Sequence, residues 1–144
     1  MVELIFVIVI LGVLAAVALP RLAASRDDAV LVKGKSQISA IRSGIVMQKS
    51  KRLLEGTTPY NPVTLDKNTT PTVLFSDGDY GNILEYGLDI GVSDGKWNRV
   101  SQDANESKYN FYLEGVAVSF TYDALTGRFA CDQPATQICK DLTH

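Results

Sequence analysis

The 144-residue sequence predicts an α+β fold, in which one long N-terminal helix packs on a small antiparallel β-sheet. An uncharged apolar run lies near the start of the chain, a helix-compatible pattern continues from it to residue 55, and alternating strands follow near the C-terminus. The chain therefore divides into an apolar helical segment (residues 1–20), an amphipathic continuation of the same helix (residues 21–56) and a head (residues 57–144). A head of this size can build only one small core.

The apolar run extends from Leu4 to Leu19 without a charged or polar side chain. Its sixteen residues would span roughly 24 Å as a helix, compared with a bilayer hydrocarbon core of ~30 Å. We interpret the segment as a transmembrane helix that can also form the core of a filament. Residues 16–18 would alternatively suit cleavage of a secretory signal. However, Glu3 stands where a signal peptide carries basic residues, and the helical pattern continues past this point.

The helical pattern continues because no proline occurs between Pro20 and Pro59. Apolar residues recur on one helical face, at Leu31, Ile38, Ile41 and Ile45. Basic residues precede Gly56, which suits the negative end of a helix followed by a glycine cap. A helix over residues 2–55 would be roughly 80 Å long. Since the head is much shorter, something other than the head must cover half of this helix.

The head is predicted to begin with an irregular region, residues 57–82, that contains a short strand at 73–75. Weak strand candidates follow at 83–90 and 97–100. The strongest signal is the alternation of large apolar and smaller residues over 116–122, preceded by a strand at 109–113. Residues 123–127 then form a hairpin turn into a last strand at 128–131. We expect this sheet to pack on the apolar stripe of the helix.

Charge is distributed unevenly along the chain. Residues 21–55 hold eight basic and three acidic residues, whereas residues 56–144 hold six basic and twelve acidic ones. The acidic head argues against a nucleic-acid-binding domain. A basic helix and an acidic head would suit subunits that pack head against neighbouring helix, although a solvated helix face explains the basic residues equally well.

Two cysteines, Cys131 and Cys139, lie near the C-terminus. We predict a disulfide between them, formed in an oxidising compartment, which would stabilise the chain end by roughly 2–3 kcal/mol. Two free thiols in a cytosolic protein are the alternative. No second cysteine pair completes a zinc site, and the single histidine is the terminal His144.

The sequence offers little catalytic chemistry, so we expect no enzyme activity and no cofactor. No nucleophile–histidine set, glycine-rich dinucleotide motif or P-loop is present. Asp89, Asp94 and Asp103 are candidate oxygen ligands for calcium, but no EF-hand spacing occurs and surface acids in turns explain all three. Asn68 and Asn105 each lie in an acid-x-Asn-x-Ser/Thr sequence, which resembles the extended acceptor site of bacterial N-glycosylation. Polar loops produce such sequences by chance as well.

The segment Glu3–Pro20 (ELIFVIVILGVLAAVALP) resembles the N-terminus of type IV pilins and type II secretion pseudopilins. A lone glutamate opens an apolar helix that has a central glycine, Gly12, and a late proline, Pro20. The resemblance covers about the first 30 residues closely and the remainder only in layout. Relative to this family, Met1 lies two residues inside the usual mature start. We therefore expect the basic leader, its cleavage site and the N-methylated first residue to lie outside the printed sequence.

The resemblance implies a pilin-like subunit of a type IV pilus or pseudopilus, held in the bacterial inner membrane with a periplasmic head until it polymerises through its helix. Glu3 would pair with a neighbouring subunit's terminal amine, and the helix would loosen between Gly12 and Pro20. Implied partners are copies of the chain, minor pilins, a prepilin peptidase and the assembly machinery, with nucleic acid only in a competence system. For Glu3 the alternative is a carboxylate at the membrane interface; for Gly12, close helix packing; for Pro20, a simple kink. The alternative function is a membrane-tethered periplasmic binding module.

Overall fold

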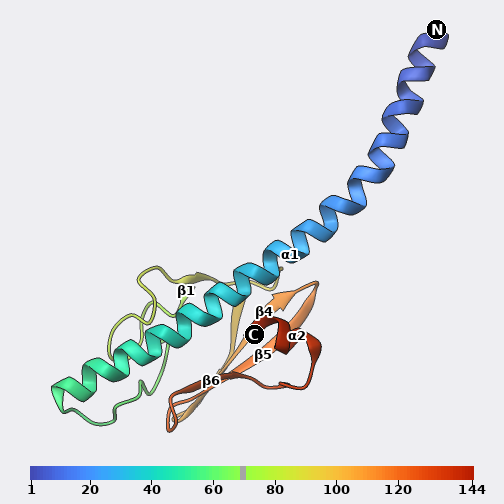
Figure 1. Cartoon of the computed structure of the whole chain (residues 1–144). Helices are drawn as coiled ribbons and strands as arrows, with labels where there is room; N and C mark the ends of the chain where they lie inside the picture. The colour runs from blue at the N-terminus through green and yellow to red at the C-terminus, as the bar shows by residue number, and fades with distance from the viewer. Residues whose placement is uncertain (69–70) are drawn as a thin grey trace.

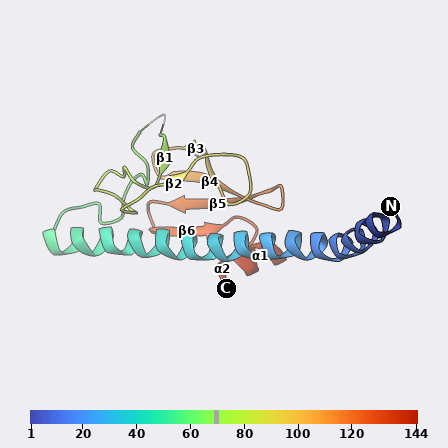
Figure 2. The ribbon, with the colours of Figure 1, turned by 90° about the horizontal axis from the view of Figure 1, so that it is seen from above.

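The computed structural model describes residues 1–68 and 71–144, except for the side chains of residues 19–25. One long helix, α1 (Val2–Glu55), runs beside the head and continues well beyond it toward the N-terminus (Figure 1). Seen from above, the strands of the head lie along one side of the C-terminal part of α1 (Figure 2). The predicted α+β class, one helix with a small antiparallel sheet, is confirmed.

Helix α1 contains 54 residues and ends where the sequence predicted. Gly56 adopts a left-handed conformation with φ 66°, and its N–H donates to the carbonyl oxygen of Leu53 at 3.3 Å. The strongly apolar residues occupy only the first third of the helix, and the remaining part is amphipathic. The helix is therefore not an apolar stem throughout its length.

The head contains a four-stranded antiparallel meander with the spatial order β3-β4-β5-β6. Its strands are β3 (Trp97–Gln102), β4 (Glu106–Leu113), β5 (Val116–Asp123) and β6 (Arg128–Cys131). Each strand predicted in this part of the chain is present, and β3 and β4 are longer than expected. The two-residue turn between β4 and β5 has positive φ at both Glu114 and Gly115, the conformation that follows the natural twist of a hairpin.

The connecting region carries a second, two-stranded sheet, β1 (Val73–Leu74) paired with β2 (Leu88–Asp89). The strand expected over residues 83–90 is wrong for most of its length, because only Leu88 and Asp89 belong to a strand. Ile83 is buried against α1, and the Leu84 N–H donates to the Phe75 carbonyl at 2.8 Å. This segment follows the surface of the helix rather than a neighbouring strand.

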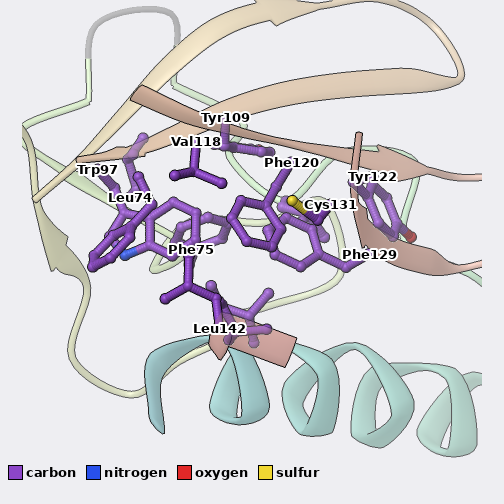
Figure 3. Packing of buried hydrophobic residues seen from close by; sticks show 14 of the residues in the cluster. Leu74, Phe75, Trp97, Tyr109, Val118, Phe120, Tyr122, Phe129, Cys131 and Leu142 are labelled. Atoms are coloured by element: carbon purple, nitrogen blue, oxygen red, sulfur yellow. The ribbon is translucent and has the colours of Figure 1, made fainter. Parts of the chain in front are cut away.

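The core lies between α1 and the inner face of the sheet and is dominated by aromatic rings (Figure 3). The predicted stripe supplies the helix side, since Ile38, Ile41 and Ile45 are buried and Leu31 is partly buried. The aromatic members are Phe75, Trp97, Tyr109, Phe111, Phe120, Tyr122 and Phe129. Centroid distances between contacting rings of 4.7–6.2 Å fall in the range that favours tilted and edge-to-face pairs.

Two glycines let α1 approach the head closely. A Cβ atom on Gly44 would lie 2.1 Å from the carbonyl oxygen of Ile83, and one on Gly34 would lie 2.7 Å from the Phe111 ring. Any larger residue would therefore force the helix away from the head. The sequence pattern did not reveal these contacts, because an isolated glycine in a helix has several explanations.

A short helix, α2 (Gln137–Thr143), closes the chain and was not predicted. It buries Cys139 and Leu142, and Leu142 lies against the core beside α1 (Figure 3). Cys139 is joined to Cys131 at the end of β6 by a disulfide, with 6.0 Å between the two Cα atoms. This agrees with the predicted pairing. The helix escaped prediction because seven residues are too few to display a period.

A buried carboxylate fixes the connecting region to the sheet. Asp66 is 1% exposed, and it accepts hydrogen bonds from the Phe75 backbone N–H and, at 2.9 Å, from the Tyr109 hydroxyl. Burial raises the pKa of the Asp66 carboxyl, and the two hydrogen bonds and the charge of Arg99 oppose this rise. The pKa of Tyr109 is raised by burial and by the neighbouring carboxylate, which keeps its hydroxyl a donor.

We predict that Gly44→Ala destabilises the head. The added methyl must displace the backbone at Ile83, at a typical cost of 1–3 kcal/mol for overpacking, which exceeds the gain of about 1 kcal/mol in helix propensity. Gly12→Ala is the matched control, because a Cβ there meets nothing within 4 Å. Urea unfolding in detergent, followed by the fluorescence of the buried Trp97, measures both variants. A Gly44→Ala protein as stable as the Gly12→Ala protein would contradict the close contact.

We also predict that Asp66→Asn removes a pH dependence of stability. The pKa of Asp66 is higher in the folded protein than in the unfolded chain. The native protein therefore loses stability as pH rises from the lower to the higher of these two pKa values, and the loss is constant above the higher one. Asparagine can still bond Phe75 and Tyr109, so this variant should lack that loss and be at least as stable at neutral pH. Asp66→Ala leaves both donors unpaired, at about 1–3 kcal/mol each. Unfolding by urea at acidic and neutral pH tests this; an unchanged pH slope in Asp66→Asn would refute it.

Candidate assembly surface

The N-terminal third of α1 exposes almost nothing but apolar side chains. From Val2 to Val17 the large apolar residues are between 43% and 81% exposed, and none of them belongs to the core of the head. Figure 1 shows this segment standing away from the rest of the chain. A continuous apolar surface of this kind marks a site of interaction with protein or lipid. Within the described residues, no helix is both long enough and apolar enough to cross a bilayer.

Glu3 lies in the first turn of α1 with its side chain exposed. This position is favourable for a carboxylate, because the unsatisfied N–H groups of the first turn carry partial positive charge. Among the described residues Glu3 takes part in no ion pair. Its carboxylate is thus available to a cation from outside the chain.

Gly12 lies in the middle of the apolar segment, with nothing within 4 Å of the place where a Cβ would be. No contact with the described residues therefore requires a glycine here. The alternative of close helix packing would need another molecule. The side chain of Pro20 lies outside the described residues, so its predicted role as a kink or a loosening point is not tested.

A second surface on α1 was missed by the sequence analysis. On the side turned away from the sheet, exposed residues without charge follow one another at spacings of four and three, which keeps them on one helical face. This outer stripe consists of Val32, Ser36, Ser39, Ser43, Val46, Ser50 and Leu53. The sequence signal was a heptad of small and branched residues, partly hidden because serine is counted as polar.

Charges of opposite sign lie at the two ends of the part of α1 that packs against the head. At the N-terminal end, acidic side chains surround a hollow of about 230 Å³ between α1, the β4–β5 turn and α2: Asp27, Asp28, Glu114 and Asp141. At the other end, the half-buried Lys49 and the exposed Lys51 lie near the C-terminal end of α1, and Arg52 lies over the ring of Tyr80. We call these the acidic neck and the basic end.

The three aspartates considered for calcium do not form one site. Asp89 is exposed in β2, Asp103 is exposed in the β3–β4 turn, and Asp94 accepts a hydrogen bond from the Gly115 N–H at 2.8 Å. Asp94 thus stabilises the β4–β5 turn. In the part of the chain that the structure describes, no three potential ligands come together to hold a metal ion.

The two acceptor asparagines lie in different surroundings. Asn105 is exposed in the turn between β3 and β4, whereas Asn68 is exposed next to the buried Asp66 and precedes residues outside the description. Neither lies on the apolar segment or on the outer stripe of α1.

Comparison of the chain with models of protein families, with curated proteins and with solved structures gives no match.

Proposed function

We propose that this protein is the structural subunit of a filament of the type IV pilus or pseudopilus kind, and that it polymerises through the N-terminal part of α1. The exposed apolar segment carries this proposal. Each of its large aliphatic or aromatic side chains would contribute about 1.5–3 kcal/mol when removed from water. Its own head covers none of them, so copies of the same segment, packed side by side, are the natural cover.

The charges and the outer stripe support a staggered arrangement of copies. Asp28 and Lys51 are separated by 23 residues (51 minus 28) of one helix, or about 35 Å. If one copy is shifted by this distance along another, its acidic neck meets the basic end of the second copy. Its apolar segment then lies beside the half of the second helix that carries Val32, Ser36 and Ser39. At this offset the apolar segments of the two copies do not overlap, so the side-by-side packing of apolar segments, and the pairing of Glu3 with an amine, involve a further neighbour in the filament at a smaller offset.

Before assembly, an isolated copy must keep its apolar segment out of water. We place this segment in the inner membrane, with the disulfide-bonded head on the periplasmic side. The partners of this state are minor filament subunits, a prepilin peptidase and an assembly machinery. Nucleic acid enters only if the filament serves competence. The proposed role is structural and requires no enzyme activity.

A membrane-tethered binding module that does not polymerise is the competing proposal. A tether explains the apolar segment, but it gives no reason for an uncharged stripe on the outer face of the helix next to the head. The outer stripe therefore favours the filament.

We predict that Glu3→Ala leaves the protein abundant in the inner membrane but blocks its entry into filaments. Within an apolar bundle, the carboxylate is satisfied only when a neighbour's amine reaches the correct offset, and an unpaired buried charge is costly. Shearing and pelleting of filaments, beside membrane levels of the subunit, measures this. The exposed Glu85 in the head provides the control, since Glu85→Ala removes the same charge elsewhere. Filaments in normal yield from Glu3→Ala would refute the role of Glu3.

We further predict that Lys51→Glu lowers filament yield at least several-fold, and that Asp28→Lys in the same chain restores it. The single change sets like charges against each other in the staggered arrangement, and the second change recreates an opposite pair. Lys140→Glu, an exposed change of equal charge on α2, is the control. The defect should weaken as salt rises, because exposed charges are screened. A double variant that assembles as poorly as Lys51→Glu would exclude this pairing.

A further inference from the structure

Two guanidinium groups lie beside the same hollow on one side of the head. Arg42 on α1 and Arg128 on β6 both line a hollow of about 370 Å³, whose remaining wall consists of uncharged residues. The Nε of Arg42 donates to the carbonyl oxygen of Phe129 at 3.1 Å, which fixes the Arg42 side chain against the edge of the sheet. Neither arginine forms an ion pair with any residue that the structure describes. The hollow is therefore a positively charged surface without a counter-charge of its own.

The positive charge continues along the same side of α1. Lys35 lies seven residues before Arg42, and Lys49 of the basic end lies seven residues after it, so all three share one helical face. Burial lowers the pKa of the Arg42 guanidinium, and the nearby charge of Arg128 lowers it further. Guanidinium groups nevertheless stay charged in proteins, so the two repel each other. We call Lys35, Arg42 and Arg128 the basic flank; an acidic partner would offset this repulsion.

The connecting region covers the other side of α1. Successive helical residues point about 100° apart, so Gly44 points about 200° away from Arg42. The carbonyl oxygen of Ile83 lies against Gly44, where an added Cβ would meet it at 2.1 Å. Figure 1 accordingly shows β1 of the connecting region and β6 on the two sides of α1. The segment that follows Ile83 thus lies at the axial level of the hollow but on the opposite side of the helix.

An exposed aromatic ring lies in this segment. Tyr86 is 81% exposed, more than any other aromatic residue of the head that the structure describes. Its Cα atom lies at most about 11 Å from that of Ile83, because they are only three residues apart. Besides the buried Asp66, residues 57–92 hold four acidic residues and one basic residue. The segment therefore combines an aromatic side chain, the type that most often anchors a protein interface, with negatively charged surroundings.

We propose that Tyr86 of one copy enters the hollow beside Arg42 and Arg128 of a neighbouring copy. The guanidinium groups would lie against the face of the ring, and the acidic residues around Tyr86 would face the basic flank. Because the two patches differ and lie on opposite sides of α1, the contact is heterologous and can repeat from copy to copy. The inference rests on the proposed filament and names one contact within it.

For parallel copies, this contact fixes a small axial offset. Arg42 and Gly44 are about 3 Å apart along α1, and Tyr86 lies within about 11 Å of Ile83. The two copies are therefore shifted by on the order of 10 Å along the helix axis. The exposed apolar residues from 2 to 17 span about 24 Å, so the apolar segments of these copies overlap. The contact thus supplies the neighbour at a smaller offset that the packing of apolar segments requires.

Photo-cross-linking in filaments tests the contact directly. We replace Tyr86 by p-benzoylphenylalanine, which keeps an aromatic ring at this position, and irradiate isolated filaments. We expect a covalent dimer in which the label is joined to one of the two tryptic peptides that line the hollow, residues 43–49 or 129–140. The same label at Tyr60, an exposed tyrosine elsewhere in the head, is the matched control and should give at least tenfold less of this product.

Filament yield measures the importance of the ring. Single exposed acids contribute little to such a contact, so the substitutions are placed on the tyrosine itself. Tyr86→Ala should lower the yield of sheared and pelleted filaments at least several-fold, whereas Tyr86→Phe, which keeps the ring, and the control Tyr60→Ala should retain it. Membrane levels of the subunit should be equal in all three, because Tyr86 lies outside the core.

The outcomes separate this contact from the proposed function. Filaments that form normally from Tyr86→Ala, or a cross-link from position 86 to any other part of the neighbour, would overturn the contact and leave the filament proposal standing. Absence of filaments from the unaltered chain would overturn the proposed function and the contact together.

Discussion

The close packing of α1 on the aromatic face of the sheet is the contact on which the rest of the structure depends. Gly34 and Gly44 bring the helix near enough for its isoleucines to enter the ring cluster. This contact uses only the C-terminal part of a 54-residue helix. The N-terminal third, which carries the most apolar residues of the chain, is consequently left without cover.

A small core gives only marginal stability, which explains why the head has two further stabilising features. The disulfide holds α2 against β6, and the buried Asp66 ties the irregular connecting region to Tyr109 and Phe75. A buried carboxyl with a raised pKa is costly when ionised. Its two hydrogen bonds offset part of that cost and specify one path for a segment that has few apolar residues of its own.

Much of this fold was predictable from the sequence because its signals are local. Three of these signals each depend on neighbours within a few residues. They are the apolar stripe at Ile38, Ile41 and Ile45, the helix cap at Gly56, and the alternation over Val118, Phe120 and Tyr122. The path of residues 83–87, helix α2 and the role of Asp66 depend on partners far along the chain. Their positions are determined by packing, and no local sequence pattern predicts them.

The features of the candidate assembly surface likewise differ in whether the sequence alone could predict them. The apolar segment and Glu3 were evident from composition, and the disulfide was predicted from the two cysteines near the C-terminus and the expected export of the head. The outer stripe was not recognised, since the exposure of Ser36 and Ser43 became meaningful only when the position of the sheet was known. Likewise, only the fold distinguishes Asp66, which is buried, from Asp103, which is not.

The most direct test of the account asks whether the apolar segments of different copies lie next to one another. A nitroxide spin label on Val9→Cys can be introduced selectively, because the two native cysteines are joined. In isolated filaments we predict dipolar broadening of its spectrum that disappears when labelled chains are diluted with unlabelled ones. The same label on Leu125→Cys, in the exposed β5–β6 turn, provides the comparison for the outer surface. A Val9→Cys spectrum that dilution does not change would contradict the account, because the apolar segments of different copies would then not lie next to one another.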